Sequence, residues 1–158
     1  MSKCVLKKQE IEILIELFYR YAMKIINVAS TFQNEFIDIT EKIQQVVSSA
    51  GTIESGYCML FVPHTTAGVT INENADPSVK ADILTMLNSL IPLEAGYRHS
   101  EGNSAAHVKS TMVGVSQLVA IEHNRLILGT WQGIFFCEFD GPRNRKVNMH
   151  LFNSQIVR

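Results

Sequence analysis

Three histidines fall in or beside the least regular segments of the chain. His64 stands at the end of an expected strand, His99 lies in an expected loop, and His107 lies on an expected short helix. Neutral imidazoles are good ligands for zinc and similar metals, and three of them form a catalytic type of site with an open coordination position. The spacing of His99 and His107 matches no metal-binding motif, so a hydrogen-bonded polar role is the competing interpretation for each histidine. His123 and His150 are expected to be ordinary surface residues.

Carboxylates form a second set of candidate groups: Glu73, Asp76, Glu138 and Asp140. Asp76 directly precedes Pro77, so it has a structural explanation as the N-cap of a helix. Glu138 shares a strand face with Ile134 and Phe136. An unpaired buried carboxylate is costly, so Glu138 must either be buried with a partner or stand at a pocket wall.

Arg143 and Arg145 follow Gly141 near the end of the chain. A guanidinium group makes paired hydrogen bonds to phosphate or carboxylate, so these side chains could hold such a group. A solvated turn is the competing interpretation. The chain contains no GxGxxG, P-loop, GxSxG or HExxH motif.

The composition is that of a folded domain. Of the 158 residues, 46% are hydrophobic and 18% are charged, which excludes a disordered tail protein and fits one domain with a proper core. The formal net charge is -1 and the isoelectric point is about 6.5. No basic excess is therefore available to neutralise phosphates, and nucleic acid is not an expected partner.

The three cysteines cannot all pair with one another, and none belongs to a CxxC motif. Cys58 and Cys137 lie inside expected strands, so we interpret them as reduced, buried thiols of an intracellular, cytoplasmic protein. The apolar run of residues 11–29 is interrupted by charged side chains, so a membrane span is not expected. Within that run, a helical spacing predicts a short amphipathic helix, formed by Ile11, Leu14, Ile15 and Phe18.

The texture of the sequence changes at Met23, so we expect residues 1–22 to be an N-terminal extension and residues 23–158 to be a single domain. Strands are predicted at residues 23–31, 57–62, 66–72, 116–121, 126–128, 131–139 and 146–152. One main helix begins at Thr40 as its cap and ends before Gly51, and a second runs from Asp76 to before Pro92. A short helix begins at Asn103 or Ser104 and runs through about Met112.

The apolar stripes of the two main helices are expected to lie in the core, and the second stripe comprises Val79, Ile83, Met86, Leu87 and Leu90. His123-Asn124 predicts a tight turn between two strands. These elements together predict an α+β fold with largely antiparallel sheets, two main helices and one short helix.

Three long motifs, taken together, resemble the YjbQ family, also called the secondary thiamine-phosphate synthase family. They are PHTTAGVTINENADP at residues 63–77, YRHSEGNSAAHVK at residues 97–109 and LGTWQGIFFCEFDGPRNRKV at residues 128–147. The resemblance covers residues 23 to the C-terminus, excludes residues 1–22, and implies two packed, mainly antiparallel sheets with helices, assembled as a homotrimer. It also implies a site at the matching positions, which are His64, Asn72, Glu73, Asp76, His99, Gly102, Asn103, His107, Trp131, Gln132, Glu138 and Arg143.

The resemblance implies a weak thiamine-phosphate synthase activity, which joins a hydroxymethylpyrimidine diphosphate to a thiazole phosphate with loss of diphosphate. Such a reaction needs anion recognition, which a metal or cationic groups supply. We hypothesise that His64, His99 and His107 converge on a divalent metal, zinc or magnesium, or on an oxyanion near a subunit boundary. Arg143 would steady a phosphate, and Asp76 or Glu138 would orient a group or act as a base.

The remaining matching positions are assigned to ligand binding: Asn72, Glu73, Asn103, Trp131 and Gln132. Trp131 could stack on a flat ring, although a role as a large core residue explains it equally well. The alternative function is a non-catalytic trimer that binds a metal ion or a small phosphorylated metabolite. The same histidines and arginine would serve both functions.

Overall fold

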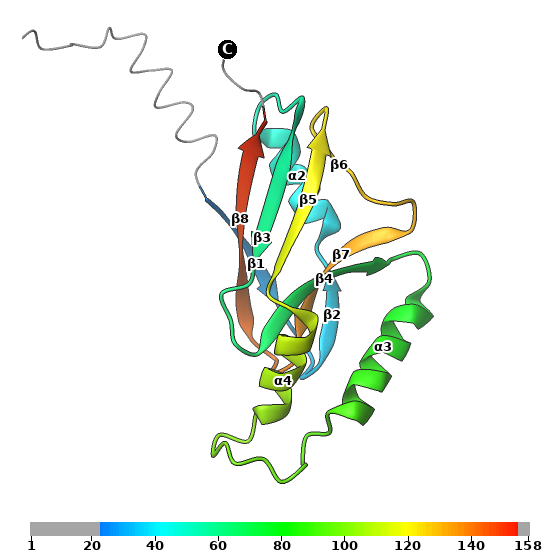
Figure 1. The fold of residues 1–158 in the computed structure, drawn as a ribbon, viewed down its shortest axis with the longest axis vertical. Coiled ribbons are helices and arrows are strands. Elements are labelled where there is room, and N and C mark those ends of the chain that lie inside the picture. Colours follow the sequence, from blue (N-terminus) through cyan, green and yellow to red (C-terminus); the bar gives the residue numbers. More distant parts are fainter. Residues whose placement is uncertain (1–22, 155–158) are drawn as a thin grey trace, which may run out of the picture.

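The computed structural model describes residues 23–154, so the amphipathic helix expected near Ile11 lies outside the described residues. The fold contains two antiparallel sheets and three helices among these residues (Figure 1). The core consists of two hydrophobic clusters, and strand β7, Gln132–Glu138, contributes to both. All of its residues from Gly133 onward are buried. Its side chains alternate between two hydrophobic clusters: Ile134 and Phe136 belong to one, Phe135 and Cys137 to the other. Such burial on both faces explains why this strand is an almost continuous apolar run.

β7 is the middle strand of a three-stranded sheet, between β2 (Glu35–Asp38) and β4 (Ala67–Glu73). The second sheet has five strands in the order β1-β8-β3-β5-β6. Their bounds are Lys24–Ala29 for β1, Asn144–Asn153 for β8, Ser55–Phe61 for β3, Ser116–Glu122 for β5 and Arg125–Leu126 for β6. The predicted α+β class and the antiparallel pairing are confirmed.

The main core fills the space between the two sheets. β3 contributes Cys58 and Leu60 to it, while the alternate residues Tyr57 and Phe61 remain 48% and 40% exposed. The apolar run in this strand therefore serves two faces of the sheet. Helix α2, Thr40–Ser49, adds Ile43 and Val47 to the same core, as its apolar stripe predicted.

The predicted cap of α2 is wrong by one position, because Ile39 occupies the N-cap and Thr40 is the first helical residue. The capping contact comes from Asp38, whose carboxylate accepts hydrogen bonds from the Thr40 N–H at 2.8 Å and the Thr40 hydroxyl at 2.6 Å. The Thr40 hydroxyl oxygen accepts the Ile134 N–H at 2.8 Å. Thr40 thus ties the helix to β7 instead of capping it.

Helix α3, Pro77–Leu90, begins as predicted, with the Asp76 carboxylate accepting the Ser78 N–H at 2.8 Å. The prediction that its apolar stripe lies in the core is wrong for the single chain, because no residue of α3 is fully buried. Ile83 and Leu87 pack only partly against the second cluster, and Leu90 is 65% exposed. The helix lies beside the three-stranded sheet (Figure 1).

Helix α4, Ser104–Val113, begins after Asn103 as predicted. The turn at His123 and Asn124 is also confirmed, with φ angles of 48° and 58°. Cys58 and Cys137 are buried free thiols, and burial raises the pKa of Cys58 to about 12. Within residues 23–154, no helix is both long and apolar enough to cross a bilayer.

Candidate functional site

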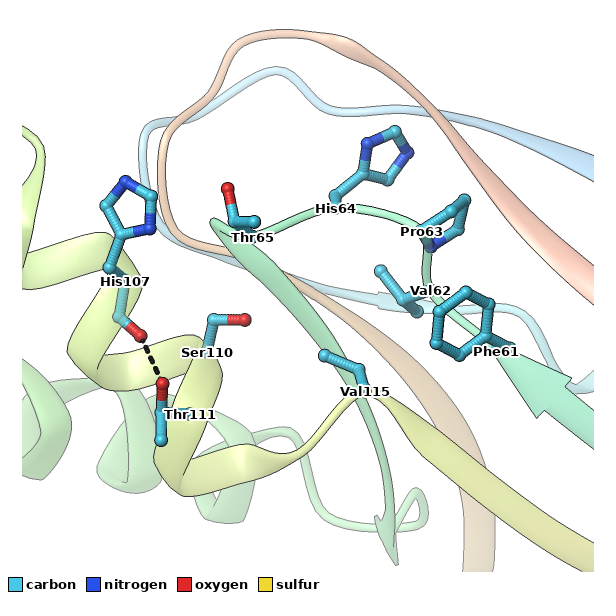
Figure 2. Close-up of a pocket in the computed structure, with 9 residues that line it drawn as sticks. All are labelled: Phe61, Val62, Pro63, His64, Thr65, His107, Ser110, Thr111 and Val115. Carbon is cyan, nitrogen blue, oxygen red and sulfur yellow. Dashed lines mark hydrogen bonds between the residues drawn. The ribbon is translucent and has the colours of Figure 1, made fainter.

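A pocket of about 590 Å³ opens where the end of β3 meets α4 (Figure 2). Its wall is apolar on one side and carries imidazoles and hydroxyls on the other. The lining residues are Phe61, Val62, Pro63, His64, Thr65, His107, Ser110, Thr111 and Val115. Two of the three predicted histidines, which lie far apart in the sequence, therefore meet at one cavity.

His64 is held by the backbone of β8. Its Nε2 atom accepts a hydrogen bond from the Lys146 N–H at 2.9 Å. Burial lowers the pKa of His64, and the nearby Arg145 charge lowers it further, against an opposing effect of Glu138. The ring is therefore neutral at pH 7, with its one proton on Nδ1.

His107 and His99 lie together beside this pocket. Their ring centroids are 5.5 Å apart and the ring planes meet at 83°, an edge-to-face arrangement. His107 also lines a neighbouring cavity of about 400 Å³ with Tyr97, His99, Ser104 and Val108. His107 is thus the imidazole shared by both cavities.

Glu138 and Arg145 form a buried ion pair behind the His64 loop. Arg145 donates from Nη2 to Glu138 Oε1 at 2.5 Å and from Nε to Oε2 at 2.7 Å. The carboxylate also accepts the Ser30 hydroxyl at 3.0 Å and the backbone N–H groups of residues 139 and 140. Arg145 Nη2 donates in addition to the Thr66 hydroxyl at 2.9 Å. The pair therefore fixes the start of β4, immediately after His64, and does not line the pocket.

Beside the pocket, helix α4 packs closely against strand β4. The Ser110 hydroxyl donates to the Ala67 carbonyl at 2.6 Å, and the Val69 N–H donates to the Gly114 carbonyl at 3.0 Å. A Cβ atom on Gly68 would lie 2.6 Å from that Gly114 oxygen. Glycine is therefore required at position 68, because only a residue without a side chain lets the end of α4 pack this closely.

Arg143, Asp140 and Asn103 form a polar chain beside the start of α4. Arg143 donates to the Asp140 carboxylate at 2.9 Å and to its carbonyl at 2.7 Å. Asn103 donates its amide to the same carboxylate at 3.2 Å, while its buried Oδ1 has no hydrogen-bond partner within residues 23–154. The Arg143 side chain is 54% exposed, so it remains accessible to a ligand.

The other predicted binding residues gather at the opposite end of the β4–β7 ladder. Glu73 pairs with Gln132 and Asn72 with Gly133, whereas Ala67 pairs with Glu138 at the pocket end. Six residue steps along the strand separate the two ends by roughly 20 Å. Trp131 is 64% exposed here, and Asp76 follows shortly after Glu73. Within one chain, these residues do not meet the histidines.

The three predicted metal ligands do not form one complete site. Structural and catalytic zinc sites use at least three protein ligands. The rings of His99 and His107 are in edge-to-face contact, whereas the Nε2 lone pair of His64 is engaged by the Lys146 N–H. The described part of the chain, residues 23–154, contains no group of three or more His, Cys, Asp or Glu side chains that could hold a metal ion. Two imidazoles alone do not make a complete metal site.

Several pocket residues were not among the predicted site residues, notably Phe61, Thr65, Ser110 and Thr111. The signal for Ser110 and Thr111 was available, because both stand one helical turn after His107 and share its face. Phe61 and Thr65 flank the segment around His64. Whether they line a pocket depends on which element packs against the end of β3, and this is decided by tertiary structure.

Two antiparallel sheets, three helices and a small pocket define an α+β fold. The family model described as UPF0047 protein YjbQ-like matches residues 24–154. This chain therefore belongs to the YjbQ/UPF0047 family, which confirms the resemblance inferred from its motifs.

Relatives and solved structures support this assignment. The UPF0047 protein YugU of Bacillus subtilis (strain 168) is 53% identical over 124 residues, which are 78% of this chain and 93% of YugU. A YjbQ/UPF0047 protein from Clostridium acetobutylicum has a crystal structure with a TM-score of 0.79 at 48% identity, covering 81% of this chain and 98% of that one. A conserved hypothetical protein from Thermus thermophilus has a TM-score of 0.75 at 44% identity, covering 81% and 98%.

Proposed function

We propose that the pocket between His64 and His107 binds a small phosphorylated molecule, and that the protein acts on it as a thiamine-phosphate synthase-like transferase. The observation that carries this proposal is that two imidazoles from separate elements open on one cavity with an apolar wall. Phe61, Pro63 and Val115 supply a surface for a flat heterocycle, and the imidazoles supply polar contacts for its anionic end.

The reaction would form one bond and break one. The thiazole ring nitrogen bonds to the methylene carbon of the pyrimidine, and the bond from that carbon to the diphosphate oxygen breaks. The electron pair leaves with the diphosphate, so no oxidant or reductant is required. Catalysis then consists mainly of positioning the two rings and stabilising the departing anion.

The chain's own residues would divide this work. Arg143 is exposed beside the start of α4 and would steady a phosphate group. Where a divalent ion such as zinc takes part, His99 and His107 would supply only two of its ligands, and phosphate oxygens of the bound molecule would have to complete its coordination; the ion would help to neutralise the diphosphate. Glu138 is enclosed by its own hydrogen bonds, so we assign it to positioning the 64–66 segment. Asp76 acts as the N-cap of α3.

A non-catalytic binding protein for a small phosphorylated metabolite is the second candidate. It is favoured by the absence of any carboxylate among the described residues that line the pocket, so the imidazoles are the only titratable groups among them. In either case we expect a cytoplasmic protein, because free buried thiols suit a reducing compartment.

The first prediction separates these candidates. The purified full-length chain, incubated with both thiamine precursors, should release diphosphate, and His107→Ala should lower the rate by about 100-fold or more, as removal of one electrostatic donor does elsewhere. His123→Asn is the matched control, because it removes an exposed imidazole paired with Glu54 and keeps a residue type that tolerates positive φ. Diphosphate release no higher than background, with retained binding of either precursor, would leave the binding protein as the function.

We also propose that the protein self-associates as a homotrimer. Met86 and Leu90 on α3 and Leu93 just after it are 57%, 65% and 50% exposed, which is unusual for the apolar side chains of one region. A second copy would cover them. Trp131, Gln132, Asn72 and Glu73 could reach a pocket only across such a boundary, because they lie far from the histidines of their own chain.

The second prediction tests this assembly. Sedimentation equilibrium should give three times the chain mass, and Leu90→Asp should shift the distribution toward the monomer, because a charge replaces a covered apolar side chain. Gln45→Asp on α2 introduces the same charge at an exposed position and should leave the mass unchanged. A monomeric wild-type chain at micromolar concentration would refute the trimer.

A further inference from the structure

We propose that His64 serves this pocket as an N–H donor to an anionic oxygen of the ligand, and that it does not ligate a metal. The inference rests on the proposed function, because it assumes that this pocket takes a phosphorylated ligand. It assigns to His64 a role different from that of His99 and His107.

The argument begins with the ring nitrogen that is already occupied. Nε2 of His64 accepts the Lys146 N–H at 2.9 Å, and a backbone N–H can only donate. Nε2 must therefore carry a lone pair, and the proton of the neutral ring is on Nδ1. A metal ligand needs a free lone pair, so binding a metal through Nε2 would require breaking the bond to Lys146.

The free nitrogen faces the ligand side. In Figure 2 the rings of His64 and His107 project to the same side of the 63–65 segment, and one nitrogen of His64 lies on the ring edge nearer to His107. Since Nε2 is bonded to the backbone of β8, this edge carries Nδ1. An oxygen bound there would receive a directed N–H and stand beside Thr65 and His107, which line the same cavity.

Burial, together with the surrounding charges, keeps the ring in this neutral form. Arg145 and Lys146 are cationic and disfavour a second proton on His64, while Glu138 acts in the opposite direction but is paired with Arg145. The Glu138–Arg145 pair and the Lys146 backbone thus position His64 by contacts made behind the pocket.

The protonation state can be measured directly. In the full chain with 15N-labelled histidine, long-range proton–nitrogen spectra should show the His64 proton on Nδ1 and a bare Nε2 at pH 7, with the resonance assigned through its loss in His64→Asn. Added inorganic diphosphate should shift the Nδ1 resonance, whereas Zn²⁺ should shift His99 and His107 first. A proton on Nε2, or a primary response of His64 to Zn²⁺, would overturn the inference.

Two variants test whether the donor must stand at the position of Nδ1. The amide nitrogen of asparagine can reach the position of Nδ1, whereas that of glutamine reaches the position of Nε2. His64→Asn should therefore keep the affinity for inorganic diphosphate within about threefold. His64→Gln should weaken it by about 10-fold or more, the effect of losing one hydrogen bond to a charged group. Equal affinities in the two variants, with both folded by circular dichroism, would contradict the donor role.

These outcomes are independent of the proposed transferase. If the chain releases no diphosphate from the thiamine precursors, but His64 carries its proton on Nδ1 and the Asn and Gln variants differ in affinity, the activity is refuted and the donor role of His64 is retained. Loss of activity in His107→Ala, together with equal diphosphate binding by the two His64 variants, would keep the proposed function and remove His64 from it.

Discussion

Replacing Arg145 by methionine should lower the free energy of unfolding by about 3–5 kcal/mol, the usual cost of removing one partner of a buried ion pair. Arg145 is 8% exposed and Glu138 is fully buried. The variant leaves the carboxylate with the Ser30 hydroxyl and two backbone N–H groups but without a counter-charge. Urea unfolding at pH 7 measures the loss.

The double variant Glu138→Leu/Arg145→Met is the matched control for this experiment. It removes the charge that the single variant leaves unpaired, so it should be more stable than Arg145→Met alone. A double variant that is less stable than the single one would show that the hydrogen bonds Glu138 accepts from Ser30 and from the backbone N–H groups of residues 139 and 140 outweigh the cost of its unpaired charge.

The same pair predicts how stability depends on pH. Burial alone would raise the pKa of Glu138, but the hydrogen bond and charge of Arg145, with the Asp140 N–H, hold it below its usual value. A carboxyl group with a lowered folded-state pKa contributes stability above its unfolded pKa, about 4.3 for Glu, and loses that contribution as the pH falls through the folded value. The wild type should therefore lose stability below about pH 4 more steeply than the double variant.

The local parts of the fold could be predicted because their causes are local. Asp76 followed by Pro77 specifies a helix start whatever the rest of the chain does, and His123-Asn124 specifies a turn with positive φ. The alternation in β4 and β8 likewise identified strands. The cap of α2 was misplaced because Asp38 and Thr40 are both good capping residues, and only the contact of Thr40 with Ile134 distinguishes them.

The position of α3 could not be predicted, because periodicity shows that a helix has an apolar face but not what covers it. The stripe that includes Ile83 and Leu87 does pack on the second cluster, yet Leu90 on the same stripe faces solvent in the single chain. The missing information is what covers this end of the stripe, which no local pattern carries.

The register of the sheet places the predicted site residues at two separate ends of the β4–β7 pair. Glu73 and Glu138 both stand on strands of the three-stranded sheet, but the antiparallel pairing of β4 with β7 puts Glu73 opposite Gln132 and Glu138 opposite Ala67. His64 then falls at the Glu138 end, where α4 brings His107. Sequence motifs name all of these residues, but only the register decides which of them share an end of the sheet.

The two faces of β7 should respond differently to the loss of a phenyl ring. Phe136→Ala should lower the free energy of unfolding by about 3–5 kcal/mol, because the ring lies between two sheets that cannot close the cavity it leaves. Phe135→Ala should cost less, near the lower end of that range, because its neighbours Ile83 and Leu87 on α3 are only partly buried and can move inward. Phe32→Ala, at a position 67% exposed, should change stability by no more than about 0.5 kcal/mol. Equal losses at Phe135 and Phe136 in urea unfolding would contradict this difference and show that α3 is held as rigidly as the sheets.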